Sequence, residues 1–232
     1  MLENLFYNIL FFSFLLPPLA FLVFFNKIGR DKKILTLVYY CVSIFLFLFF
    51  TEAIITEKVI LLIPQKIKFP LYTLLEYSFF VILIYQQLKL KPLKTTMIVS
   101  SVAFLAFEVL YYFIPHSKQK IDSVPIGFET ILIFVFIFLF LYEEFKDVKG
   151  TPIYENYFFW VSIGLFIYLG GSFFIYLYAN TLTDPELEKY WFFTYIVEII
   201  KNLLFISAIF VYSKNPNKIT PSQTLPNLDF ML

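Results

Sequence analysis

The sequence predicts an all-α fold: a polytopic transmembrane bundle of seven helices, with the N-terminus outside and the C-terminus in the cytoplasm. Composition is the first reason, because 60% of the 232 residues are hydrophobic and 22% are aromatic, whereas soluble domains are about 45–50% apolar. The second reason is that seven stretches have roughly the 20 apolar residues that a helix needs to cross a bilayer. The third is the distribution of lysine and arginine between the loops, which indicates the orientation.

The seven predicted spans are separated by short polar segments. These segments include NKIGRDKK, KLKPLK, PHSKQK and NTLTDPELEK, whose charged residues and prolines are typical of breaks between helices. None of them is long enough to hold a soluble domain. The third span is short, and Glu129 interrupts the fifth span near its start. The predicted spans cover residues 5–25, 34–55, 70–87, 95–114, 124–143, 157–178 and 191–212.

The first span and the C-terminal segment each carry a distinct pattern. The first span has no basic residues before it, is too long for a signal peptide and is followed by basic residues, so it is predicted to remain as a helix. Pro17 and Pro18 remove two consecutive backbone donors and predict a kink within this span. Residues 213–232 are rich in Pro, Asn and Thr, which predicts a disordered cytoplasmic tail.

The orientation follows from the positive residues near the ends of the spans. If the N-terminus is outside, the inner segments contain eleven Lys and Arg residues and the outer loops contain six. Because Lys and Arg accumulate on the cytoplasmic side, this difference favours a protein of the cell's inner membrane with its N-terminus out and its C-terminus in. The inner set is Lys27, Arg30, Lys32, Lys33, Lys89, Lys91, Lys94, Lys146, Lys149, Lys214 and Lys218, and the outer set is Lys58, Lys66, Lys68, Lys118, Lys120 and Lys189.

Several function classes are excluded by composition. The net charge of +1 gives no basic face for nucleic acid. Cys41 is the only cysteine and His116 the only histidine, which excludes disulfide frameworks, Cys/His zinc sites and Cys–His dyads within one chain. Glu143 and Glu144 resemble the paired glutamates of CAAX-type membrane proteases, but the Arg and His residues of those enzymes are missing. We therefore predict no catalytic residue, no metal site and a non-enzymatic protein.

The stretch YIVEIIKNLLF places Glu198 and Lys201 inside the seventh span, with Lys201 near the middle of the membrane. A charged residue at this depth costs about 2.5–3.5 kcal/mol on insertion scales if it faces lipid. Such residues are therefore expected to face the bundle interior or a water-filled cavity. The predicted depths place five carboxylates from five helices in the outer half of the membrane: Glu52, Glu76, Glu108, Glu129 and Glu198.

Helical spacing predicts which side chains share a face with these charges. We expect Lys201 to form the floor of an acidic cavity that opens to the outside, with Glu198 or Glu76 as its partner. Two alternatives remain: the network only fixes helix packing, or it conducts protons or ions. The candidate cavity residues, for a ligand or an ion, are Glu76, Tyr77, Glu108, Glu129, Tyr168, Ser172, Tyr195, Glu198, Lys201 and Asn202.

Two resemblances to known seven-helix families cover only part of the pattern. A mid-membrane lysine in the last helix is similar to the Schiff-base lysine of microbial rhodopsins, but Val197 stands where those proteins carry an Asp. Retinal on Lys201 is thus an alternative, and no cofactor is predicted. Seven helices are also found in SWEET and PQ-loop transporters. The Pro64-Gln65 pair of this chain lies in a predicted outer loop, and the first three spans do not resemble the last three.

Four stretches resemble small seven-helix integral membrane proteins of Bacteroidota, which look like detached seven-helix sensory modules of bacterial histidine kinases. They are LYTLLEYSFF, FETILI, FFWVSIGLFIYLGGSFF and WFFTYIVEIIKNLLFISAIF. The resemblance implies a sensory or accessory protein that acts on a separate signalling or complex partner through its cytoplasmic loops or tail. A small transporter or ion pathway and a structural subunit of a larger membrane complex remain alternatives.

Overall fold

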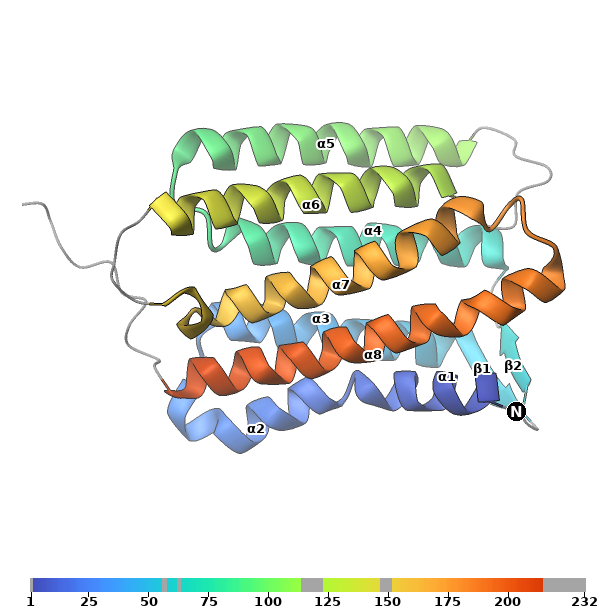
Figure 1. Cartoon of the computed structure of the whole chain (residues 1–232), viewed down its shortest axis with the longest axis horizontal. Coiled ribbons are helices and arrows are strands. Elements are labelled where there is room, and N and C mark those ends of the chain that lie inside the picture. The colour runs from blue at the N-terminus through green and yellow to red at the C-terminus, as the bar shows by residue number, and fades with distance from the viewer. Residues whose placement is uncertain (1, 56–57, 62–63, 114–122, 147–151, 215–232) are drawn as a thin grey trace, which may run out of the picture.

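The computed structural model describes residues 2–55, 58–61, 64–113, 123–146 and 152–214. Its long helices run side by side along the longest axis of the molecule (Figure 1). A two-stranded hairpin follows the third helix, and a single 3-10 turn precedes the seventh. The elements are α1 (Leu2–Ser13), α2 (Leu16–Ile28), α3 (Lys32–Thr51), β1 (Glu52–Ile55), β2 (Lys58–Leu61), α4 (Gln65–Tyr85), α5 (Lys91–Phe113), α6 (Ser123–Lys146), η1 (Ile153–Glu155), α7 (Tyr157–Tyr178) and α8 (Asp184–Lys214).

Within the described residues, seven helical segments are long and apolar enough to cross a membrane, with α1 and α2 together making the first. Large apolar side chains cover the outside of the bundle. Val23 is 76% exposed, Leu110 67% and Phe113 75%. A soluble monomer rarely exposes apolar surface on this scale, whereas lipid solvates it well. The predicted architecture of a helical, multi-pass membrane protein is therefore confirmed.

The first span is broken where the sequence predicts a kink. Helix α1 ends at Ser13 and α2 begins at Leu16, with Pro17 and Pro18 in its first turn. Because neither proline has a backbone N–H, the carbonyl groups four residues earlier lose their helical donors. The chain makes a turn at the break, where the backbone N–H of Leu15 donates to the carbonyl oxygen of Phe12 at 3.0 Å.

The ends of most predicted spans differ from the structure by a few residues. The second was expected to continue to residue 55, but α3 ends at Thr51 and residues 52–55 form β1, which pairs antiparallel with β2. The stretches EAII and KVIL are rich in β-branched residues and are separated in the sequence by the polar pair Thr56-Glu57, which favours a hairpin over a helix. Helices α4 and α8 begin at 65 and 184 rather than 70 and 191.

The predicted tail also differs where the structure describes it. Helix α8 includes residues 213 and 214, which the sequence assigned to the start of the tail. The rest of the predicted tail, from 215 to 232, lies outside the described residues, as do Lys118, Lys120, Lys149 and His116.

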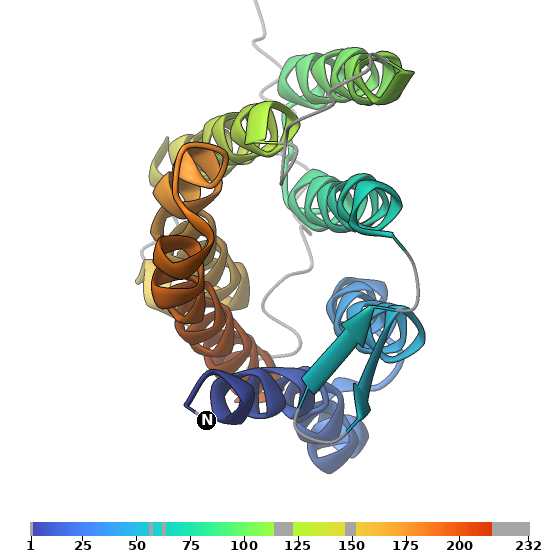
Figure 2. The ribbon, with the colours of Figure 1, turned by 90° about the vertical axis from the view of Figure 1, so that its right-hand side faces the viewer.

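Helices α7 and α8 share the most extensive helix–helix contact, and α8 also packs on α1 and α2. Viewed along the bundle, α6, α7, α8 and the α1–α2 pair form a curved wall that faces α3 and α4, while α5 lies at the edge beside α4 and α6 (Figure 2). Gly171 of α7 permits the close α7–α8 approach. A β-carbon at this position would lie 2.6 Å from Cγ1 of Val197.

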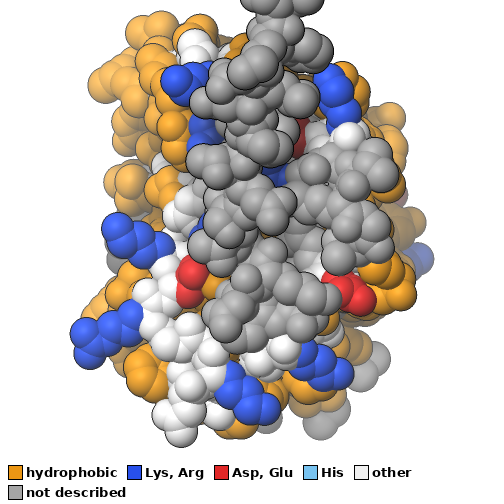
Figure 3. All heavy atoms as spheres, turned by 90° about the vertical axis from the view of Figure 1, so that its left-hand side faces the viewer, with side chains coloured by type: hydrophobic (Ala, Val, Ile, Leu, Met, Phe, Trp, Pro, Cys, Tyr) orange, Lys and Arg blue, Asp and Glu red, His pale blue; other side chains and the backbone are white. Residues whose placement is uncertain are grey.

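The two ends of the bundle differ in charge. One end, which we call the hairpin end, carries the N-terminus of α1, the β1–β2 hairpin and the α7–α8 loop (Figure 1). The opposite end, which we call the basic end, is surrounded by Lys and Arg side chains (Figure 3). Its described members are Lys27, Arg30, Lys32, Lys33, Lys89, Lys91, Lys94, Lys146 and Lys214. The lysine side chains described at the hairpin end are Lys68 and Lys189.

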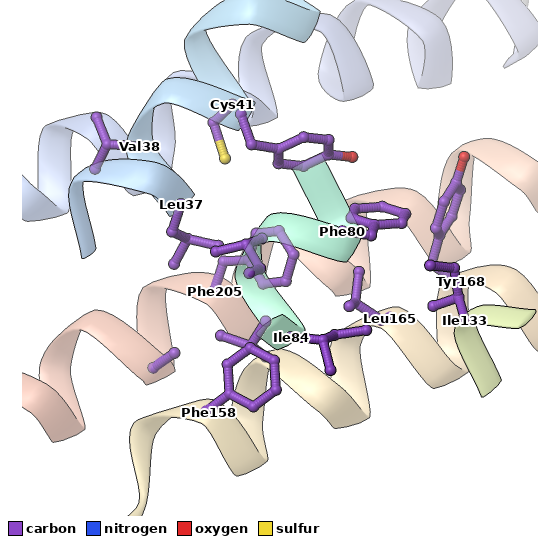
Figure 4. Packing of buried hydrophobic residues seen from close by; sticks show 14 of the residues in the cluster. Leu37, Val38, Cys41, Phe80, Ile84, Ile133, Phe158, Leu165, Tyr168 and Phe205 are labelled. Carbon is purple, nitrogen blue, oxygen red and sulfur yellow. The ribbon is translucent and has the colours of Figure 1, made fainter. Parts of the chain in front are cut away.

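The half of the bundle toward the basic end has a closely packed apolar core. Phe80, Ile84, Phe158, Leu165 and Phe205 come from α4, α7 and α8, and each is completely buried. Their side chains meet in one cluster (Figure 4). Cys41 is buried in the same core, in agreement with a packing role. Glu76, Glu129, Glu198 and Lys201 are buried on the side of this cluster that lies toward the hairpin end.

Candidate functional site

Lys201 lies in the middle of α8 with its side chain completely buried. Its Nζ donates hydrogen bonds to the hydroxyl oxygen of Tyr40 at 2.6 Å and to Oε1 of Glu198 at 3.2 Å. The same nitrogen lies 3.6 Å from Oε1 of Glu76 on α4. Both glutamates that the sequence predicted as partners of Lys201 therefore lie beside it. A buried ammonium is tolerated only with such compensation, because leaving water costs several kcal/mol.

Three tyrosines connect the two carboxylates. The hydroxyl groups of Tyr40 and Tyr168 donate to Oε1 and Oε2 of Glu76, at 2.7 and 2.8 Å. The hydroxyl of Tyr72 lies 3.0 Å from Oε1 of Glu198 and 3.4 Å from Oε1 of Glu76. The network thus joins α3, α4, α7 and α8 in one layer. Charge-assisted hydrogen bonds of this kind are stronger than neutral ones.

Aromatic rings surround the ammonium group of Lys201. Nζ lies 4.1 Å from the ring centroid of Tyr168, 5.0 Å from that of Tyr40 and 5.2 Å from that of Phe14. The electron-rich face of an aromatic ring attracts a cation at such distances. The fold therefore holds one alkylammonium group, that of Lys201, between carboxylates and aromatic rings. A cavity lined by the same kinds of side chains lies next to it.

A cavity of about 110 Å³ lies between this network and the hairpin end. Helices α1, α3, α4, α6, α7 and α8 contribute its walls. Three carboxylates and one amine line it: Glu76, Glu129, Glu198 and Lys68. A single water needs only about 10–15 Å³ on the same scale, so several waters or a small molecule fit. The aromatic lining consists of Tyr7, Phe69, Tyr72, Tyr168, Tyr176, Trp191 and Tyr195.

Glu129, in the first part of α6, is distinctive among the three carboxylates. Its side chain is buried, with 3% exposed, and lines the cavity. Its Oε1 has no hydrogen-bond partner among the residues that the structure describes. Buried polar atoms are nearly always satisfied, and Glu129 combines an unpaired acceptor with a place in the cavity lining, which makes it the candidate contact for a bound molecule.

The predicted set divides into two groups. Glu76, Glu129, Tyr168, Tyr195 and Glu198 lie on the cavity wall, with Lys201 directly behind them. The other predicted members are buried elsewhere and do not line this cavity: Tyr77 donates to Oγ of Ser101 on α5, Ser172 to the carbonyl oxygen of Tyr168, Asn202 to Oγ of Ser13, and Glu108 lies on α5. The side chain of Glu52 lies outside the described residues.

The sequence did not nominate several members of the site. They are Tyr40, Tyr72 and Phe14 around Lys201, and Tyr7, Lys68, Phe69, Tyr176, Trp191 and Thr194 on the cavity wall. The reason is clearest at Tyr40, whose neighbour Tyr39 is 58% exposed while Tyr40 is completely buried. Both are tyrosines in the same apolar span, and the sequence alone does not distinguish them. The only signal in the sequence that could have identified Tyr40 is that a tyrosine lies close to the predicted layer of buried carboxylates.

Comparison of this chain with protein-family models, with curated proteins and with solved structures finds no match. The resemblance of its helices to seven-helix proteins of Bacteroidota accordingly stays a prediction. The site joins the ammonium group of Lys201, which is paired with Glu76 and Glu198, to a cavity with acidic and aromatic walls.

Proposed function

We propose that the protein is a non-enzymatic sensory or accessory protein of the inner membrane that binds a small ligand in this cavity. The observation that carries the proposal is the position of the cavity. It ends at the Lys201 network, and below that network the apolar cluster around Phe80, Leu165 and Phe205 is completely buried. A cavity that stops at a network of charged side chains, with a packed apolar cluster beyond it, is suited to binding a ligand and detecting its presence.

The proposed orientation places the basic end in the cytoplasm. By sequence, the segments on that side contain eleven Lys and Arg residues, against six in the segments on the hairpin side, and positive residues favour the cytoplasmic side. Lys68 and Trp191 are lining residues in the hairpin-side parts of α4 and α8, and their side chains are half-buried. The cavity would then be reached from outside, with the N-terminus out and the C-terminus in.

The effect of ligand binding would be transmitted to the basic end through the hydrogen bonds and salt bridges around Lys201. Glu76 and Glu198 line the cavity and also contact Lys201, so a ligand that interacts with either carboxylate changes the balance of forces on that amine. Tyr40 and Tyr168 extend the network to α3 and α7. A ligand that favours one arrangement of these helices would shift their relative positions, which a separate partner at the basic end could read.

A transporter or proton pathway is the second candidate. Glu129 and the Glu76–Lys201–Glu198 group favour it, because ionisable side chains inside a membrane bundle often mark ion or proton routes. The buried apolar cluster below Lys201 argues against a continuous route in the arrangement described here. Proton flux in proteoliposomes that depends on Glu129 would favour transport over sensing.

The proposal is tested by filling the cavity. Thr194 lines it, is 2% exposed and donates only to the carbonyl oxygen of Trp191 in its own helix among the contacts described. Thr194→Phe would fill the space without removing a charge. Leu203→Phe on the exposed side of α8 is the control, since Leu203 is 48% exposed.

We expect native mass spectrometry of the purified protein to detect a bound small molecule that Thr194→Phe abolishes and Leu203→Phe retains. Circular dichroism would verify that both variants are folded. If the same mass is bound to all three proteins, the cavity is not the binding site. Partners that co-purify with the unaltered protein would identify the component that responds.

A further inference from the structure

We infer that the cavity takes a small organic monocation, an amine or quaternary ammonium ion, with Glu129 as its counter-ion. This inference rests on the proposed function and names the class of ligand. It is carried by three features of the site: the balance of charges, the open acceptor on Glu129 and the aromatic walls.

The first feature is the balance of charges. Glu76, Glu129 and Glu198 contribute three carboxylates to the cavity wall, while Lys68 lines the cavity and Lys201 lies behind it. Lys201 is paired with Glu76 and Glu198, so Glu129 is the carboxyl group of the wall that has no ion-pair partner among the described residues. A bound monocation would pair with Glu129, whereas an anion would face three acidic side chains in a region of low dielectric constant.

The second feature is the distribution of the existing partners. Glu76 receives hydrogen bonds from Tyr40 and Tyr168 and lies 3.6 Å from Nζ of Lys201, and Glu198 contacts Lys201 and Tyr72. Glu129 is as deeply buried as Glu76, and its Oε1 accepts no hydrogen bond from the described residues. A ligand that donates to this oxygen or places a positive charge beside it supplies what the wall lacks.

The third feature is the aromatic side chains that line the cavity together with the carboxyl groups. Tyr7 and Tyr195 meet edge to face with centroids 5.9 Å apart, and Tyr176 and Trp191 do so at 5.6 Å. Ring faces attract organic cations, and tryptophan does so best. Metal ions such as Ca²⁺ or Mg²⁺ require a shell of six or more oxygen ligands, which a wall of rings does not offer. The chain already uses this combination for its own ammonium at Lys201.

The experiment uses Trp191 as the reporter. The chain has two tryptophans, and Trp160 lies on α7 near the basic end, where its indole N–H donates to the carbonyl oxygen of Tyr154. Trp160→Phe therefore leaves a single indole on the cavity wall. The full chain in nanodiscs is titrated with tetramethylammonium, tert-butanol and pivalate, which are similar in shape and carry charges of plus one, zero and minus one.

We expect a saturable change in Trp191 fluorescence with tetramethylammonium, an affinity weaker by about tenfold or more for tert-butanol, and no binding of pivalate. Sodium chloride at the same concentration should not displace the cation. This comparison needs no variant of the acidic residues. Equal affinity for tert-butanol, or displacement by sodium, would overturn the organic-cation assignment while ligand binding in the cavity still stood.

Glu129→Gln tests the counter-ion, and Glu108→Gln is the matched control. Both side chains are 3% exposed, but Glu108 lies on α5 and does not line the cavity. We expect Glu129→Gln to weaken tetramethylammonium binding by about tenfold and Glu108→Gln by less than about twofold. Unchanged affinity in folded Glu129→Gln would refute the role of Glu129.

Thr194→Phe separates the two proposals. Loss of tetramethylammonium binding in this variant locates the ligand in the cavity and supports both. A response that persists in Thr194→Phe, or the absence of a saturable response to tetramethylammonium in the unfilled protein, would refute the organic-cation inference. The proposed function fails separately, if native mass spectrometry finds the same bound mass in Thr194→Phe as in the unaltered protein.

Discussion

The hydroxyl group of Tyr40 on α3 lies 2.6 Å from Nζ of Lys201 on α8, across 161 positions of the chain. The same hydroxyl donates to Oε1 of Glu76 at 2.7 Å. Tyr40 therefore accepts a hydrogen bond from the amine and donates one to the carboxylate, linking opposite charges on two helices. This single side chain holds α3 to the polar layer on which the proposed site is built.

Tyr40→Phe should lower the free energy of unfolding by about 1–3 kcal/mol, because it leaves a buried charged donor and acceptor each short of one hydrogen bond. Tyr39→Phe is the control on the adjacent position, which is 58% exposed. It should change stability by less than about 0.5 kcal/mol. Denaturant titration in mixed micelles measures both. Equal effects at the two positions would contradict the assigned role of Tyr40.

Lys201→Met should destabilise the fold by about 3–5 kcal/mol, since it leaves Glu76 and Glu198 as neighbouring buried carboxylates without their cation. The loss should be partly recovered in the double variant Lys201→Met with Glu198→Gln, because one uncompensated charge is also removed. A double-mutant cycle of unfolding free energies gives the coupling between the two residues. Strictly additive losses would mean that the pair does not interact in the membrane.

Gly171→Ala should be destabilising by about 1–3 kcal/mol, because the new methyl group would overlap the side chain of Val197 in the α7–α8 contact. Gly170 is the control, since a β-carbon there meets its nearest atom, in Phe134, at 3.5 Å. Gly170→Ala should be neutral or slightly stabilising. Adding Val197→Ala should rescue Gly171→Ala. Thermal unfolding of the four proteins tests the contact, and a failure of rescue would place the strain elsewhere.

Glu143 forms a clamp at the basic end that the sequence did not predict. Its two carboxylate oxygens accept hydrogen bonds from the backbone N–H groups of Lys89 and Leu90, at 2.7 and 2.9 Å. In the sequence, Glu143 and Glu144 resemble only the paired glutamates of CAAX-type proteases, and no contact is predicted for either side chain. The structure shows that Glu143 fastens the α4–α5 loop to the end of α6.

Glu143→Ala should therefore speed amide hydrogen exchange in the α4–α5 loop and cost about 1–3 kcal/mol of stability, since two partly buried backbone N–H groups each lose a hydrogen bond. Glu144→Ala is the neighbouring control. Its partner Lys89 has a side chain that is 45% exposed, and a pair so exposed contributes about 0–1 kcal/mol. If both variants leave loop exchange unchanged, the clamp does not restrain the loop.

The sequence predicts the features that depend on a single helix. Apolar runs of sufficient length predicted seven membrane-crossing helices, and Pro17 and Pro18 predicted the break between α1 and α2. The three-residue spacing of Glu198 and Lys201 predicted their salt bridge, because residues three apart share one face of a helix. Local backbone chemistry and hydrophobicity determine these features wherever the helix packs.

Only the tertiary structure decided how each helix is rotated about its axis. Rotation selected Tyr40 over Tyr39 for the network, and it placed Glu129 on the cavity wall while α5 holds Glu108 away from it. Lipid solvates an apolar face as readily as a neighbouring helix does, so hydrophobic periodicity is a weak guide to rotation inside a membrane. Close contacts such as Gly171 against Val197 and the hydrogen bonds of the Lys201 layer choose the rotation instead, and these depend on the partners that folding brings together.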